Sequence, residues 1–468
     1  MSVSKKINSF ILLLKQSLLG EQQDYTSGSI DRAILLLSIP MILEMSMESL
    51  FAVIDVYYVS QLHDNDAVAT IGLTESILTL IYSLAMGISM GATAMVARRV
   101  GEKDIKAAEV AAAQAIFVGV ALSLAISISG VFFSTDLLRA MGANEHLIVK
   151  NSGYIKWMLT GNITIMMLFL VNGIFRGAGD AFIAMRSLWL ANILNIMLDP
   201  VFIFGLGPIP AFGVEGAAIA TNIGRGMGVL YQLYHFQKGK GLIKLHAENL
   251  LIQWKIIVRL IKVSAGGTSQ FLIGSASWIF LVRIMADFGS AALAGYTIAI
   301  RIIVFAILPA WGMANAAATL VGQNLGAGHP ERAEKSVWRA AFLNMVFLAF
   351  VTVLFYSLAG PILRLFTGDE EVLRNGIQCL QIVSLGYIFY AYGMVINQSF
   401  NGAGDTRTPT IISFFGFWLF QIPLAYALAN WFAVGPVGVY SAIAIAESLM
   451  AIIGIVIFRQ GKWKKVEI

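Results

Sequence analysis

Three carboxylates lie at helical spacing inside an apolar segment near the start of the chain. Glu44, Glu48 and Asp55 are separated by four and then seven residues. At about 100° per residue, these spacings place all three within roughly 40° on one face of a helix. Because an ionisable residue at bilayer depth usually faces a cavity or a polar partner, we predict an acidic stripe that contacts water or partners. The alternative for Glu44 is a solvated position near the end of the helix.

A second group of oxygen-bearing side chains follows in two later apolar segments. Asn195 and Asp199 are four residues apart, with Pro200 next, and Ala217 and Thr221 are again four apart. Residues at this spacing share a helix face. Two carboxylates, an amide oxygen, a hydroxyl and a backbone carbonyl form a set suited to a hard cation such as Na⁺, and paired carboxylates can instead share a proton. The alternative is structural: Asp199 caps a helix break and Asn195 bonds to neighbouring backbone.

The composition indicates that these residues belong to a membrane-spanning chain. Of 468 residues, 58% are apolar and only 13% are charged, whereas a soluble domain carries about 25% charged residues. Together with a mean hydropathy of +0.77, this predicts a membrane protein with many spanning helices. A single cysteine, Cys379, argues against a disulfide framework or a thiolate metal cluster. No GxxxxGK[ST] motif occurs, which argues against direct use of ATP.

Twelve apolar segments have the length of about 20 residues that a spanning helix needs. We expect them at 34–59, 67–95, 107–133, 151–175, 182–206, 214–236, 256–285, 291–320, 336–359, 376–400, 408–430 and 436–458. Most of the Lys and Arg residues, Arg176 among them, then fall on the side of the membrane that holds both termini. The positive-inside rule assigns that side to the cytoplasm. We expect a multi-pass protein of the plasma (inner) membrane, whose basic residues require no nucleic-acid partner.

The chain repeats itself at an offset of about 225 residues. Three motif pairs carry the repeat: VARRVGEKDIKAAE (96–109) with VGQNLGAGHPERAE (321–334), RGAGD (176–180) with NGAGD (401–405), and GVEGAAIA (213–220) with GPVGVYSAIA (435–444). A shift by six helices preserves orientation, so the halves are parallel repeats, as in alternating-access transporters. The alternative is duplication in a channel or a receptor. The predicted parts are an N-terminal interfacial segment (1–29), two six-helix lobes (30–237 and 256–459), a cytoplasmic linker (238–255) and a cytoplasmic tail (460–468).

The two halves differ in the charges that they carry within the spans. Leu281 or its neighbour matches Asp55, and Ile422 matches Asp199. Arg301 and Glu447 in the second half lack an obvious partner in the sequence, and the alternatives are that they pair with each other across the cavity or that they line it. Coupling chemistry is therefore predicted in the N-terminal half.

Taken together, these features resemble the multidrug and toxic compound extrusion (MATE) family. The resemblance extends over about 30–460 and rests on the twelve spans in two parallel halves, on Pro40 fifteen residues before Asp55, on Asn195 and Asp199, and on the paired Gly-Ala-Gly-Asp turns. It implies an all-α membrane protein with a V-shaped pair of lobes. It also implies an antiporter that exports organic, often cationic drugs against Na⁺ or H⁺, with no other cofactor.

The resemblance also assigns roles to individual residues. The cation site, and the metal site if the ion is Na⁺, would comprise Asp55, Asn195, Asp199 and Thr221, with Ala217 contributing its carbonyl. Pro40 would allow the first helix to bend. The expected partners are small organic cations and the lipid bilayer, and the expected state is a monomer. The residues expected to line the substrate cleft are Glu44, Glu48, Phe51, Gln270 and Asn397.

Two other functions compete with this interpretation. A related flippase for lipid-linked precursors would line its cleft with Arg and Lys, whereas the stripe here is acidic. An intramembrane hydrolase is suggested by Gly87-Ile-Ser-Met-Gly91, which matches G-x-S-x-G. That string lies inside a predicted helix, where small residues serve close helix packing. The sequence therefore predicts that the protein is not an enzyme.

Overall fold

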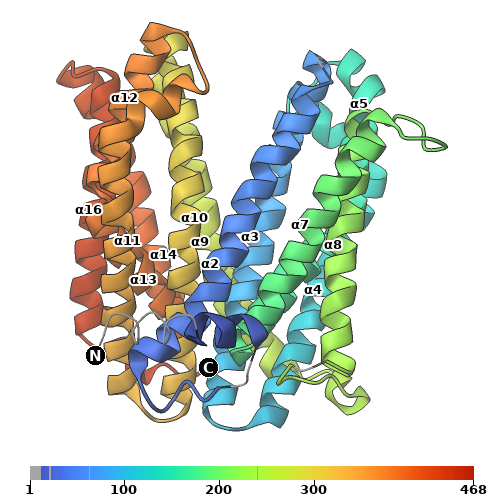
Figure 1. Cartoon of the computed structure of the whole chain (residues 1–468), viewed down its shortest axis with the longest axis vertical. Helices are drawn as coiled ribbons and strands as arrows, with labels where there is room; N and C mark the ends of the chain where they lie inside the picture. Colours follow the sequence, from blue (N-terminus) through green and yellow to red (C-terminus); the bar gives the residue numbers. More distant parts are fainter. Residues whose placement is uncertain (1–11, 21–22, 63, 240) are drawn as a thin grey trace. The chain divides into compact units, whose positions relative to one another are not determined.

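The computed structural model describes residues 12–20, 23–62, 64–239 and 241–468, and within them the chain is helical, with no β-strand (Figure 1). Residues 12–19 form a short helix; the rest of the predicted interfacial segment lies partly outside the described residues. The helices that follow are α2 (Ile30–Ser60), α3 (Asn65–Gly101), α4 (Ile105–Ala140), α5 (Glu145–Thr160), α6 (Asn162–Ala178), α7 (Ala181–Phe204), α8 (Val214–Gln237), α9 (Trp254–Ala286), α10 (Ser290–Gly326), α11 (Pro330–Arg364), α12 (Glu370–Leu385), α13 (Tyr387–Ala403), α14 (Arg407–Ser413), α15 (Ile422–Tyr426) and α16 (Pro436–Arg459). A π-helical stretch (Phe414–Gln421) joins α14 to α15, a second one (Ala427–Trp431) follows α15, and short 3-10 turns follow α8 and α16.

A helical segment forms at each of the twelve predicted spans. Within the described residues, ten are long and apolar enough to cross a membrane, and α12 with α13, bent by 58°, makes an eleventh if the pair is one span. The twelfth, α8, has 24 residues but is not among them. Its polar side chains, Arg225 and Gln232 among them, are buried and bond to neighbouring helices. Partners of this kind offset the cost of polar groups at membrane depth.

The chain divides into two compact units, each described separately here. Unit 1 comprises Met1–Gln23 and Leu43–Thr268, and unit 2 comprises Asp24–Ile42 and Ser269–Ile468. This division differs from the expected lobe boundaries at 30 and 256, because α2 and α9 each contribute to both units. Close backbone approaches explain the difference. Gly312 on α10 lies against the backbone of Ile42, and Gly87 on α3 lies against Thr268.

The two Gly-Ala-Gly-Asp turns have the same conformation. Gly179 ends α6 at φ +90° and Gly404 ends α13 at φ +89°, a left-handed region in which glycine avoids the strain that a Cβ would cause. In both turns the aspartate N–H donates to the carbonyl five residues earlier, at 2.8 Å for Asp180 and 2.9 Å for Asp405. The sequence repeat is therefore also a structural repeat at these positions.

In each unit the segment that follows the sixth predicted span of that half binds to duplicated residues. In unit 1 the predicted linker lies against α4 and the α6–α7 turn: Asp180 accepts from the Leu242 N–H at 2.5 Å, and Glu109 accepts from the Lys244 N–H at 3.1 Å. In unit 2 the tail takes this role, because Lys464 pairs with Glu334 at 2.5 Å and Ile468 lies against Gly404.

We predict that Asp180 makes a pH-dependent contribution to the stability of the folded protein. Burial raises its pKa to about 7, although the hydrogen bond from Leu242 and the charge of Lys244 lower it. Because the pKa is raised on folding, the protonated form stabilises the folded state at low pH, and this contribution is lost as pH rises through about 7. Asp180→Asn keeps an oxygen acceptor but cannot ionise. Its unfolding temperature relative to wild type should therefore rise between about pH 5 and about pH 8.

Thermal unfolding of the purified protein in detergent, followed across this pH range, measures the difference. Asp405→Asn, in the equivalent turn of unit 2, is the matched control for changing the turn itself. A difference between Asp180→Asn and wild type that stays constant across the range would contradict the prediction.

Candidate functional site

Three of the predicted cation-site residues contact one another between α7 and α8. Gly224 allows α8 to approach the backbone of α7 beside Asn195. With its amide oriented to satisfy both of its groups, Asn195 donates to Asp199 Oδ2 at 2.8 Å, and its oxygen accepts from Thr221 Oγ1 at 2.9 Å. The Asp199 side chain is 0% exposed, and its Oδ1 has no hydrogen-bond partner among the residues that the structure describes. Since α7 continues through Pro200, the alternative that Asp199 caps a helix break is wrong.

Asp55 on α2 completes an acidic pair with Asp199. Its side chain is half-buried, and it interacts electrostatically with Asp199, Glu75 and Arg225. Ala217 is buried one turn before Thr221 on α8. Two like charges in an apolar environment repel each other, and a bound cation or a proton relieves that repulsion.

The described residues hold no group of three or more His, Cys, Asp or Glu side chains that could hold a metal ion. A cation at this site would therefore depend on the two carboxylates together with neutral oxygens. The amide of Asn195 and the hydroxyl of Thr221 supply such oxygens, and a set of this kind suits a hard monovalent ion or a proton.

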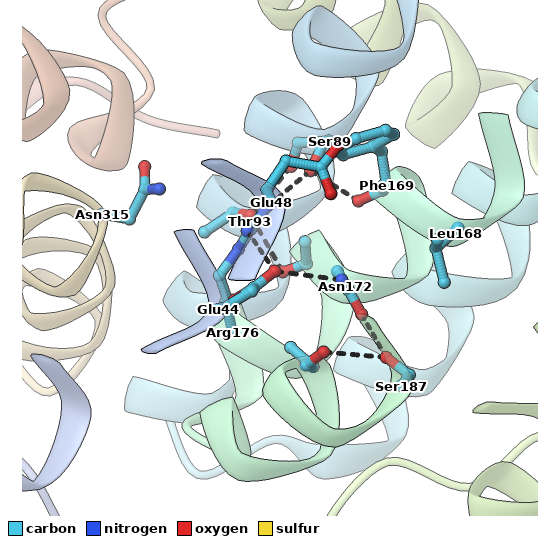
Figure 2. A network of polar contacts seen from close by, with 12 residues as sticks. Glu44, Glu48, Ser89, Thr93, Leu168, Phe169, Asn172, Arg176, Ser187 and Asn315 are labelled. Atoms are coloured by element: carbon cyan, nitrogen blue, oxygen red, sulfur yellow. Dashed lines mark hydrogen bonds and ion pairs between the residues drawn. The ribbon is translucent and has the colours of Figure 1, made fainter. Parts of the chain in front are cut away.

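Glu44 belongs to a buried polar network that joins α2, α3, α6, α7 and α8 of unit 1, and Figure 2 shows part of it. Its Oε1 accepts from Asn172 Nδ2 and from Arg176 Nη1, both at 3.0 Å, and Arg176 also donates to Ser89 at 3.0 Å. Asn172 in turn accepts from Ser187 on α7 at 2.8 Å and from Gln232 on α8 at 2.7 Å. Glu44 is only 1% exposed, so the alternative of a solvated position at the end of the helix is wrong.

Glu48, one turn further along α2, is also paired with an arginine. It accepts from Asn192 at 2.9 Å and from Arg225 Nη2 at 3.4 Å. Arg225 is not among the residues predicted from the sequence, and Arg176, predicted to lie with the cytoplasmic basic residues, has a buried side chain. An arginine inside a predicted span was the signal, because such a charge needs a partner.

The Ser89 motif has no hydrolase geometry. Ser89 lies within α3, where its hydroxyl donates to the carbonyl of Phe169 at 2.8 Å and Gly173 packs against it. Gly87 packs against Ser264 and Thr268 of α9. The motif therefore serves close helix packing, as the sequence analysis expected.

Unit 2 holds a neutral counterpart of the pair formed by Glu44 and Arg176. Gln270 on α9 and Asn401, which opens the second Gly-Ala-Gly-Asp turn, exchange hydrogen bonds at 3.0 and 3.2 Å. Arg176 and Asn401 are equivalent in the repeat, so the same contact is ionic in one half and uncharged in the other. Asn397 is half-buried on α13.

Two further predicted features can now be located. Pro40 lies inside α2, two residues before this helix passes from unit 2 to unit 1. In the described part of unit 2, no ion pair joins Arg301, which is exposed, to Glu447, which is half-buried.

Long apolar helices in two units that share repeated motifs, with buried ion pairs in one of them, are typical of a multi-pass membrane transporter. The MatE family model matches 40–201 and again 269–427, once in each half of the predicted duplication. The chain belongs to the MatE family, whose members are transporters and not enzymes.

Curated relatives and solved structures agree with this membership. The chain is 26% identical to "Probable multidrug resistance protein NorM" of Thermotoga maritima, over 93% of this chain and 94% of that protein. It is 22% identical to "Multidrug export protein MepA" of Staphylococcus aureus, over 92% of this chain and 94% of that protein. A solved outward-facing multidrug resistance MATE family transporter superposes with a TM-score of 0.89 at 28% identity, over 95% of this chain and all of that one (100%).

The ion pair between Glu44 and Arg176 predicts strong non-additivity between two substitutions. Glu44→Gln and Arg176→Gln each leave a buried charge without its partner, which costs about 3–5 kcal/mol. The double variant removes both charges and should lose less stability than the sum of the two single losses. Thermal unfolding of the purified variants measures this. Additive losses would show that the two side chains do not stabilise each other.

Proposed function

We propose that the protein is a cation-coupled antiporter that exports small organic, predominantly cationic compounds by alternating access. It would act as a monomer in the plasma (inner) membrane, with both termini in the cytoplasm. The names of the relatives, a multidrug resistance protein and a multidrug export protein, support drug-like compounds as substrates. The observation that carries the proposal is Asp199, a buried carboxylate that has no basic partner among the described residues and lies beside a second acid, Asp55.

The coupling ion, Na⁺ or H⁺, would bind where the negative charge is least compensated. Glu44 and Glu48 each pair with a buried arginine, whereas Asp199 hydrogen-bonds to a neutral amide. Binding of a cation by Asp55, Asn195, Asp199 and Thr221, with the carbonyl of Ala217, would neutralise this site. A coupled ligand shifts a transporter between two arrangements only if it binds one of them more tightly. Pro40, which removes a backbone hydrogen bond from α2, supports a bend there as the responding movement.

The chemistry of the buried charges also favours cationic substrates over the flippase alternative. A flippase for lipid-linked precursors needs uncompensated positive charge for phosphates. Arg176 and Arg225 are each paired with a glutamate instead. Glu48, whose side chain is partly exposed, and Phe51 remain proposed substrate contacts in unit 1. Gln270 and Asn397 remain proposed contacts in unit 2.

Transport driven by an imposed ion gradient tests the coupling directly. In proteoliposomes that contain the purified protein, an inward-directed Na⁺ gradient or an inward-directed pH gradient should drive export of a fluorescent organic cation. The reversed gradient serves as the control. Export under neither gradient would remove the antiporter assignment.

Substitution of the two acids tests where the ion binds. Asp55→Asn and Asp199→Asn should each abolish gradient-driven export, because each removes a charge that the coupling cation neutralises, while both proteins remain folded in membranes. Glu447→Gln changes a carboxylate at membrane depth in unit 2 and is the matched control, expected to retain export. Full export by either aspartate variant would show that the coupling site lies elsewhere.

A further inference from the structure

Arg225 is a buried cation whose guanidinium is only partly satisfied. The residue is 2% exposed. Its Nη2 makes one long ion pair, 3.4 Å from Glu48 Oε1, and Nε and Nη1 have no hydrogen-bond partner among the described residues. A buried charge is costly when its donors are unpaired. The position of Arg225 therefore suggests a second acceptor that this arrangement does not use.

Aromatic rings hold the guanidinium without fixing it to a single acceptor. The Arg225 Cζ lies 5.7 Å from the ring centres of Phe51 and Tyr82, and 5.4 Å from that of Phe169. Ring faces attract a cation without the strict geometry of a hydrogen bond. The Arg225 side chain can thus change its carboxylate partner and remain in contact with the same three rings.

The register of α2 identifies the second acceptor. Phe51, one of the three rings, lies three residues after Glu48 and four residues before Asp55. At these spacings all three side chains share a helix face, so Arg225 lies beside the residue midway between the two carboxylates. The groups whose charges act on Arg225 are Tyr82, Glu48 and Asp55. Asp55 is also the acid that interacts with Asp199.

We propose that Arg225 is a tethered cation that exchanges between Glu48 and Asp55 and thereby competes with the coupling cation for Asp55. When the cation occupies its site, Arg225 pairs with Glu48. When the cation leaves, Arg225 turns to Asp55 and compensates its charge. Arg225 is thus a positioning residue: it sets the affinity of the site without contributing a ligand. This inference rests on the proposed function.

Substitutions of Arg225 and of Glu48, which should change the affinity for the coupling cation in opposite directions, test the exchange. Arg225→Gln removes the competitor and should lower the half-saturating concentration of the coupling cation about five- to tenfold, whereas Glu48→Gln leaves Asp55 as the sole acceptor and should raise it by a similar factor. Arg225→Lys keeps the charge and should remain near wild type. The readouts are the unfolding temperature of the purified protein against cation concentration and, in proteoliposomes, the cation concentration at half-maximal export.

Arg176→Gln is the matched control, because it also removes a buried arginine from a glutamate pair in unit 1. It should lower stability without moving the half-saturating concentration. If Arg225→Gln does not elute as a folded protein on size exclusion, Glu48→Gln and Arg225→Lys decide the question: the exchange requires a raised half-saturating concentration in the first and an unchanged one in the second.

The outcomes separate this inference from the proposed function. Shifts of opposite sign in Arg225→Gln and Glu48→Gln support the exchange. Shifts of the same sign, or none in a protein whose wild type responds to the cation, overturn the exchange and leave the antiporter intact. A wild type that responds to neither Na⁺ nor H⁺ overturns the proposed function, and the inference with it.

Discussion

The cost of placing a charge in an apolar environment governs the interior of unit 1. An ionised side chain at membrane depth needs a partner, a polar cavity or a functional reason. Glu44 meets this requirement through Arg176 and Asn172, and Glu48 through Arg225 and Asn192. Asp199 does not: among the described residues it has no basic partner, and it hydrogen-bonds to the neutral amide of Asn195 and interacts electrostatically with another acid, Asp55. Glu44 and Glu48 thus each have a basic partner, whereas Asp199 has a second acid beside it.

The two duplicated halves share a backbone conformation at their Gly-Ala-Gly-Asp turns but differ in the charge of the side chains there. Both Gly-Ala-Gly-Asp turns have the same left-handed glycine, and both aspartates make the same backbone bond. At the residue that opens each turn, Arg176 pairs with a glutamate, whereas Asn401 pairs with the neutral Gln270. An amide pair places no ionised group in an apolar interior, whereas an ion pair places two ionised groups there, each of which depends on the other. The halves can therefore retain one backbone conformation at this turn while one half carries an ion pair and the other a neutral pair.

Much of the fold and part of the candidate site could be predicted, because hydropathy and helical spacing are properties of short segments. Each of the twelve predicted spans contains helix, and Asn195 does reach Asp199 and Thr221. The contacts of Glu44 and Glu48 could not be predicted. Their arginine partners lie 132 and 177 residues away along the chain, and a spacing rule within one helix contains no information about a neighbouring helix. The lobe boundaries differ for the same reason, since the packing of Gly312 against Ile42 assigns the start of α2 to unit 2.

By itself, the sequence determined the class of protein, the duplication and the acids on one face of α2. These features follow from composition, from period and from repeated motifs, each readable along a single chain. Only the tertiary structure decided which of those acids are already neutralised, because charge compensation depends on side chains that different helices bring within a few ångströms of each other. Glu44 and Asp55 look alike as acids on one stripe. Packing places Glu44 in a buried ion pair with Arg176, whereas it leaves Asp55 beside another acid, Asp199.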